Sequence, residues 1–130
     1  MKEAHQVFGN ALVLPLRGRL DHETTPAFRE RLTEAMRRAA GDQLTIVLEL
    51  SGLEYLSSPG LNALIIGSRT ARKEGVAMHA AALQPMVFRS WEISHLTLIV
   101  QTFPTLEEAL QVVSADAAQA YAAANKTTRT

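Results

Sequence analysis

The chain has 130 residues, enough for one domain, and its composition of 47% hydrophobic and 20% charged residues is ordinary for a globular protein. Its thirteen basic and thirteen acidic side chains cancel, which argues against nucleic-acid binding because such proteins normally carry a basic excess. The absence of cysteine excludes disulfides, thiol catalysis and cysteine-ligated metals.

The first half of the chain predicts two strands and a helix between them. Residues 11–17 are apolar and of strand length, but Pro15 cannot donate to a β-ladder, so this strand should lie at an edge or carry a bulge. Residues 25–40 have helical spacing, begin with a capping threonine and a proline, and are followed by Gly41 as a stop. Residues 44–50 are nearly all apolar, as in a strand covered on both faces.

The second half predicts alternating helices and strands. A helix leaves Ser58 and ends at Gly75, and Thr105 with Glu108 spells a capping box that opens another helix. The further elements are a strand at 76–81, a short helix at 85–91, a fourth strand at 96–100 and the capped helix at 105–113.

Strands that alternate with helices predict an α/β fold, a mixed sheet of four or five strands with about four helices packed against it. The connection from 44–50 through the helix after Ser58 to 76–81 should be a right-handed parallel crossover. We assign residues 1–113 to a single domain. Residues 114–130 are alanine-rich and polar, and we expect them to prolong the last helix or to be disordered.

The strand-to-helix junction at Ser57, Ser58, Pro59 and Gly60 is the most informative stretch. Serine is a preferred N-cap, and proline fits the first helical turn because its missing N–H would be unpaired there. We therefore interpret Ser58 as the N-cap and Pro59 as the first helical residue. This puts a hydroxyl at the positive end of a helix, where anionic groups are tolerated. Without further evidence, Ser58 is only a cap that contributes about 1 kcal/mol.

Three segments resemble a known family. Gly18-Arg-Leu-Asp21, the stretch from Leu48 to Leu61, and Thr105-Leu-Glu-Glu-Ala-Leu110 are similar to a STAS domain, over roughly residues 5 to 113. STAS domains occur in bacterial anti-sigma factor antagonists and in sulfate-transporter tails. The resemblance implies a STAS-like fold and partner switching. The antagonist binds an anti-sigma factor that is also a serine kinase with an ATPase fold, phosphorylation of one serine breaks the complex, and a serine phosphatase restores it.

Carried over to this chain, the phosphoacceptor of the family falls on Ser58, with Ser57 as the alternative. Gly60 and Leu61 match the residues that follow it. The chain departs from the family at Ser57, where aspartate is frequent, and at Pro59, where serine, threonine or alanine is usual. The predicted partner-binding surface is formed by Ser57, Ser58, Pro59, Gly60, Asn62, Ala63 and Ile66.

Two other functions remain open. Pro59 motivates a STAS adaptor subunit of a transporter complex that is never phosphorylated. The helix N-terminus motivates a small-anion or nucleotide sensor. The sequence brings Asp21, His22 and Ser58 into no catalytic arrangement, the four histidines lack metal-ligand spacing, and the glycines form no phosphate loop. We therefore expect no catalytic residues, no metal, no cofactor and no enzymatic activity.

The remaining expectations concern location. No apolar run approaches the roughly 18 residues needed to span a bilayer, and Met1 to Gln6 lack the apolar core of a signal peptide. We expect a cytoplasmic protein that does not insert directly into the membrane.

Overall fold

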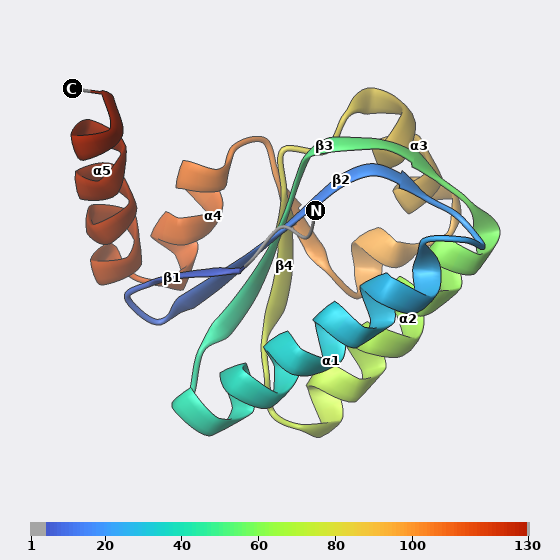
Figure 1. Ribbon diagram of the computed structural model, residues 1–130, viewed down its shortest axis with the longest axis horizontal. Helices are drawn as coiled ribbons and strands as arrows, with labels where there is room; N and C mark the ends of the chain where they lie inside the picture. The colour runs from blue at the N-terminus through green and yellow to red at the C-terminus, as the bar shows by residue number, and fades with distance from the viewer. Residues whose placement is uncertain (1–4, 130) are drawn as a thin grey trace.

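The computed structural model describes residues 5–129, and of residues 126–129 only the backbone (Figure 1). Within this range a five-stranded sheet has the strand order β1-β2-β3-β4-β5. The first strand pairs antiparallel with the second, and all other neighbours are parallel, so the predicted mixed sheet is confirmed. The strands are β1 (Gln6–Phe8), β2 (Ala11–Leu20), β3 (Thr45–Leu56), β4 (Met78–Ala81) and β5 (Gln101–Phe103).

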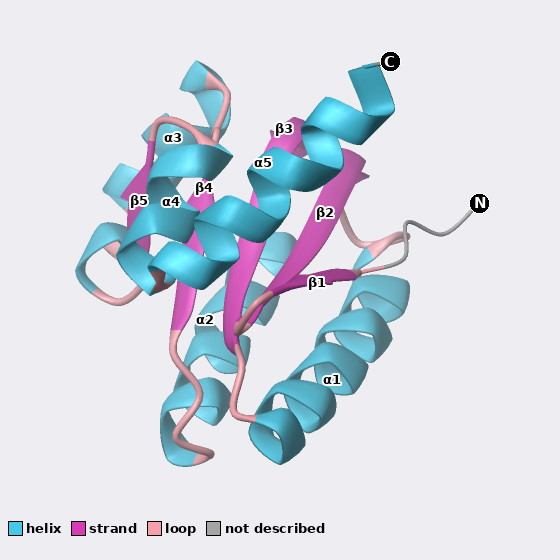
Figure 2. Cartoon of the chain, turned by 90° about the vertical axis from the view of Figure 1, so that its left-hand side faces the viewer, coloured by secondary structure: helices cyan, strands magenta, loops and turns pink. Residues whose placement is uncertain are grey.

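The helices cover both faces of the sheet. Because the parallel strands follow one another in chain order, crossovers of one hand place all the connecting helices on the same face. Accordingly α1, α2 and α3 share one apolar cluster, whereas α4 and α5 cover the opposite face (Figure 2). The helices are α1 (Thr25–Asp42), α2 (Ser58–Lys73), α3 (Pro85–Ile93), α4 (Leu106–Val113) and α5 (Ala115–Arg129), with a 3-10 turn at Leu96–Leu98.

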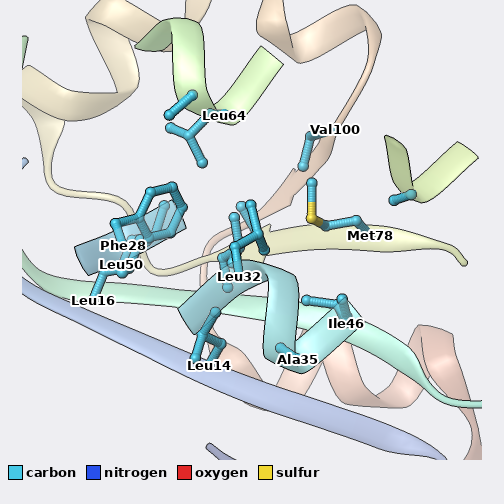
Figure 3. Packing of buried hydrophobic residues seen from close by; sticks show 14 of the residues in the cluster. Leu14, Leu16, Phe28, Leu32, Ala35, Ile46, Leu50, Leu64, Met78 and Val100 are labelled. Atoms are coloured by element: carbon cyan, nitrogen blue, oxygen red, sulfur yellow. The ribbon is translucent and has the colours of Figure 1, made fainter. Parts of the chain in front are cut away.

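The first halves of β2 and β3 are buried on both faces of the sheet, as predicted for residues 44–50. Alternate residues of a strand point to opposite faces. Leu14, Ile46 and Leu50 belong to the larger cluster beneath α1 and α2 (Figure 3). Val13 and Val47, one residue away from these, lie in the smaller cluster beneath α4 and α5. The sheet therefore has two cores, and the larger one supports the helices that begin at the candidate site.

Pro15 lies where the sheet tolerates it. Among residues 5–129 the ladder between β1 and β2 reaches only to Val13, so in this range β2 is an edge strand from Pro15 onward. The register between β2 and β3 also shifts between Pro15 and Arg17. Both predicted consequences of the proline, an edge and an irregularity, are confirmed.

The strand predicted at residues 96–100 is wrong. Leu96 and Val100 are buried, while Leu98 between them is 83% exposed, a spacing of four that suits a helical turn and not a strand. His95 adopts φ 62°, which turns the chain into the 3-10 segment. The fifth strand begins only at Gln101.

Helix boundaries follow local hydrogen bonds. The capping box is confirmed, because the Thr105 hydroxyl accepts from the Glu108 N–H at 3.1 Å. For α1, the N-cap is Thr24 and not Thr25, and Gly41 lies inside the helix. The helix ends instead at Gln43 in the left-handed region (φ 57°), and the Leu44 N–H then reaches the Ala39 carbonyl at 2.9 Å.

Residues 115–129 form a separate helix and do not prolong α4. Ser114 is extended (φ −174°), and its hydroxyl accepts from the Ala117 N–H at 3.0 Å. Ala117 is fully buried, and the Tyr121 ring meets Phe8 edge-on, with 5.3 Å between ring centroids. Small alanines allow α5 to approach the turn between β1 and β2 closely. The domain boundary after residue 113 stays a prediction.

We expect Ala117→Asp to destabilise the protein by at least about 2 kcal/mol, because it buries a carboxylate without a partner. Ala122→Asp is the matched control on the same helix. Its side chain is exposed, so it should cost only the helix propensity of aspartate, about 0.7 kcal/mol or less. Urea unfolding measures both. Equal losses would mean that α5 does not pack at Ala117 in solution.

Candidate functional site

The candidate site lies where β2 and β3 end side by side. Leu20 and Leu56 are register partners at the carboxyl ends of the two strands, and α2 begins two residues later (Figure 1). In sheets of parallel strands, this edge is where ligands and partners usually bind, because loops and helix N-termini converge there.

One carbonyl ties the two strand ends together. The Leu20 carbonyl accepts hydrogen bonds from both the N–H and the hydroxyl of Ser57, each at 2.9 Å. The same hydroxyl accepts from the Gly60 N–H at 3.3 Å. Ser57 therefore links the end of β2 to the first turn of α2 through a single side chain.

These bonds correct the predicted cap. Ser57, not Ser58, is the N-cap of α2, with extended backbone angles (φ −87°, ψ 173°). Ser58 is the first helical residue, and Pro59 is the second. Proline fits either position, because neither N–H has a partner within the helix. The proline therefore marked the helix start but not the residue that caps it.

The first turn of α2 retains few free donors. The Gly60 N–H is used by the Ser57 hydroxyl, the Leu61 N–H reaches the Ser57 carbonyl at 2.8 Å, and Pro59 has no N–H. Among the hydrogen bonds of the described residues, none uses the N–H of Ser58. Anion sites at helix N-termini depend on several such donors, so this geometry weakens the case for a small-anion or nucleotide sensor.

Gly60 is fixed by steric crowding. It is buried, and a Cβ atom at this position would lie 2.8 Å from the Leu20 carbonyl oxygen and 2.9 Å from Leu20 Cγ. The carbonyl oxygen belongs to the backbone and already holds Ser57, so it cannot shift without opening the junction. Gly60 allows the close approach and is itself buried.

Four of the seven residues of the predicted partner-binding surface are exposed. Ser58, Pro59 and Asn62 are exposed, and Ile66 is 49% exposed. The Ser58 hydroxyl makes no hydrogen bond with any residue that the structure describes. Of the other residues predicted to bind a partner, Gly60 and Ala63 are buried and Ser57 is half-buried and bonded to Leu20.

Arg19 and Tyr55 are surface neighbours of the junction that the sequence did not reveal. They face each other in the register of β2 and β3, and the Arg19 guanidinium lies 4.1 Å from the centre of the Tyr55 ring. Arg19 Nε is also 3.5 Å from a carboxylate oxygen of Asp21. The motif Gly18–Asp21 marked the segment, but only the pairing register places Tyr55 beside it.

The carboxylate of Asp21 is directed into its own loop. It accepts from the N–H of Thr24 at 3.2 Å and of Glu23 at 3.0 Å. The Thr24 bond is the main cause that holds the pKa of Asp21 below its usual value. No hydrogen bond among the described residues joins Asp21, His22 and Ser58, so the structure does not assemble them as a catalytic trio.

Metal-binding clusters and membrane-spanning helices are both absent from the part of the chain that the structure describes. No cluster of three or more histidine, aspartate or glutamate side chains has the arrangement of a metal site there. No helix in the same range is long and apolar enough to cross a membrane.

The family model of the STAS domain matches residues 3–109. The chain belongs to the STAS domain family. Its junction at Ser57–Gly60 is thus the strand-to-helix junction of a STAS domain, and the family expected from the three segments is confirmed.

Several of the proteins to which the chain is similar are anti-sigma factor antagonists. The anti-sigma F factor antagonist of Paenibacillus polymyxa is 29% identical over 99 residues, which cover 76% of this chain and 83% of that protein. The crystal structure of an anti-sigma factor antagonist from Mycobacterium paratuberculosis is 26% identical, with a TM-score of 0.70 over 84% of this chain and 90% of that one.

The fold is shared with a further antagonist. SpoIIAA from Bacillus is 23% identical, and its structures are known in the unphosphorylated form (TM-score 0.67) and the phosphorylated form (TM-score 0.63). Both cover 85% of this chain, and the chain covers 96% and 99% of them.

We expect Ser57→Ala to destabilise the domain by about 0.5–2 kcal/mol, because it removes the N-cap and a bond to the Leu20 carbonyl. Ser58→Ala is the matched control and should change stability by about 0.5 kcal/mol or less, because its hydroxyl is exposed. Thermal and urea unfolding measure both. The reverse order would restore Ser58 as the cap.

We expect Gly60→Ala to destabilise the domain by about 1–3 kcal/mol, because the new methyl group meets a backbone oxygen that cannot retreat. Gly41→Ala is the control, because Gly41 lies in α1 with no atom within 4 Å of a Cβ there. That change should stabilise by up to about 1 kcal/mol through helix propensity. A tolerated Gly60→Ala would contradict the close contact with Leu20.

Proposed function

We propose that this protein is an anti-sigma factor antagonist, which binds an anti-sigma factor and is released from it by phosphorylation of Ser58. The observation that carries the proposal is the division between two adjacent serines. Ser57 is bonded on both sides, whereas Ser58 is exposed at the first position of α2. The similar antagonists from Paenibacillus polymyxa and Mycobacterium paratuberculosis support the same role.

In this proposal the partner is both anti-sigma factor and serine kinase. It has an ATPase fold and supplies the phosphate from ATP, so this chain contributes an acceptor hydroxyl and a docking surface and performs no catalysis. Because Ser58 is exposed, a serine phosphatase can also reach the phosphorylated side chain and restore the binding form. In this proposal the cycle of binding, phosphorylation and dephosphorylation takes place in the cytoplasm.

Phosphorylation at Ser58 should leave the domain folded. A phosphate adds about −1.5 to −2 charges at neutral pH. The N-terminus of a helix carries a positive partial charge, which favours an anion there by about 0.3–1 kcal/mol. SpoIIAA, whose phosphorylated form has this fold, is consistent with that expectation. The added charge would change only what a partner meets around Pro59, Asn62 and Ile66.

Ser57 is the weaker candidate for the modified residue. Its hydroxyl donates to the Leu20 carbonyl and accepts from the Gly60 N–H. A phosphate on this oxygen would remove the donor and place negative charge against a carbonyl oxygen. The modification would then act by opening the junction, at a cost in stability that a reversible switch does not require.

We expect Ser58→Asp to lower the affinity for the anti-sigma factor by at least about tenfold, because a charge buried in the contact would be repelled or left without a partner. Ser58→Ala should bind as the unmodified protein does. Calorimetry against each purified anti-sigma factor kinase of the source genome measures both, and thermal unfolding verifies that the variants are folded. Equal binding of the two variants would contradict the charge mechanism.

The same kinases test the acceptor directly. Incubation with ATP followed by mass spectrometry should find phosphate on Ser58 and none on a Ser58→Ala variant. Phosphate on Ser57 instead, or none with a kinase that modifies another antagonist, would overturn the assignment. Capture of transport ATPase subunits in place of a soluble kinase would favour the adaptor function.

A further inference from the structure

A groove of about 470 Å³ runs between α1 and α2, on the sheet face that carries the larger core. Its floor is apolar and formed by Leu32 and Met36 of α1 and by Ala63 and Gly67 of α2. In Figure 1 the two helices lie side by side and run from the start of α2, at the right, toward the lower left of the molecule.

Small residues of α2 create this groove. Gly67 has no side chain, and a Cβ there would collide with Cδ2 of Leu32. Ala63, one turn earlier, is only 3% exposed. The two helices therefore approach each other closely at Gly67 and Leu32, and the space between their longer side chains remains open as the groove.

The groove continues the surface that holds Ser58. Ser58, Asn62, Ile66 and Thr70 follow one another at intervals of four residues, which places them on one side of α2. All four are exposed, and the last two line the groove. Ile66 is the largest apolar side chain in this row and is 49% exposed. A partner in contact with Ser58 and Asn62 would next meet Ile66 and the groove.

The α1 rim carries unpaired positive charge. Arg29 and Arg37 line the groove, both are exposed, and neither forms an ion pair or hydrogen bond with a residue that the structure describes. The acidic residues Glu30 and Glu34 of the same helix do not line it. One acidic residue, Glu74, lines the groove; it is the C-cap that follows α2.

We propose that this groove receives an acidic amphipathic helix of the anti-sigma factor. Apolar side chains of that helix would cover Leu32, Met36 and Ile66, and its carboxylates would meet Arg29 and Arg37. This is the helix-in-groove mode of recognition. The inference rests on the proposed function, because it assigns a second contact to the same partner beyond the surface around Ser58.

The spacing of the arginines defines the partner sequence. Arg29 and Arg37 are eight residues apart, about 12 Å along the axis of α1. A helix lying along the groove would match them with carboxylates seven or eight residues apart, separated by apolar residues at intervals of three and four. Such a pattern can be recognised in the sequence of a candidate anti-sigma factor.

The variant Arg29→Glu/Arg37→Glu tests the charge complementarity. We expect it to weaken binding of the anti-sigma factor by about tenfold or more and to reduce the salt dependence of the affinity. The matched control, Arg72→Glu/Lys73→Glu, makes the same change in net charge on exposed residues of α2 that do not line the groove. It should alter the affinity by about threefold or less. Circular dichroism melts verify that both variants are folded.

The outcomes separate the two proposals. If the unmodified protein binds none of the anti-sigma factors, the proposed function fails. If it binds and the groove variant binds equally well, or if the control loses as much as the groove variant, the groove proposal is overturned and the proposed function stands.

A probe independent of the anti-sigma factor is a designed helical peptide with a leucine stripe flanked by glutamates. Titrated into the ¹⁵N-labelled protein, it should shift the amide signals of Thr33, Ile66 and Thr70, and a lysine-flanked version should not. No shift, shifts at other sites, or equal binding of both peptides would contradict the acidic-helix proposal. Sedimentation that shows a dimer with those same amides protected would identify a second copy as the occupant and also overturn it.

Discussion

The two hydrogen bonds from Ser57 to the Leu20 carbonyl organise the functional edge of this protein. They join the last residue of β2 to the residue that follows β3, at a point where the two chain segments would otherwise diverge into loops. The same hydroxyl accepts a hydrogen bond from the Gly60 N–H in the first turn of α2, so the axis of the helix is set relative to β2. Gly60 completes the contact, because any larger residue would press on the oxygen that Ser57 needs. Everything that α2 presents to a partner depends on this contact.

In the proposed function, anchoring and regulation are divided between two adjacent residues. Ser57 holds the junction, and Ser58 projects from it. Pro59 fixes its own backbone φ and donates no hydrogen bond, so the turn that carries Ser58 is stiff and poor in donors. Under the proposed function a partner would recognise a rigid shape whose charge can change, and the proposed modification would need no rearrangement of the core. The groove between α1 and α2 lies on the same continuous side of α2, so one partner can contact both.

The sequence predicted the architecture well, because the apolar runs of β2 and β3 and the proline-marked helix starts are strong local signals. It placed the N-caps of α1 and α2 one residue too late, because proline is accepted at both the first and the second helical position. For α2, only the tertiary hydrogen bond from Ser57 to Leu20 decides between the two positions. The strand expected at residues 96–100 failed because Leu96 and Val100 are buried with helical spacing. The packing of α5 was not predicted, because the residue that α5 buries in the core is Ala117. Its small side chain fits against the sheet, but an alanine gives no hydrophobic signal in an alanine-rich segment.

The position of α5 has a practical consequence. Its end and the start of α2 lie at opposite ends of the longest dimension of the molecule (Figure 1). Helices α4 and α5 also occupy the sheet face that α1 and α2 leave free. A fluorescent reporter or an immobilisation tag attached at the end of α5 would therefore extend away from the Ser58 edge and leave it accessible in single-molecule or biosensor formats.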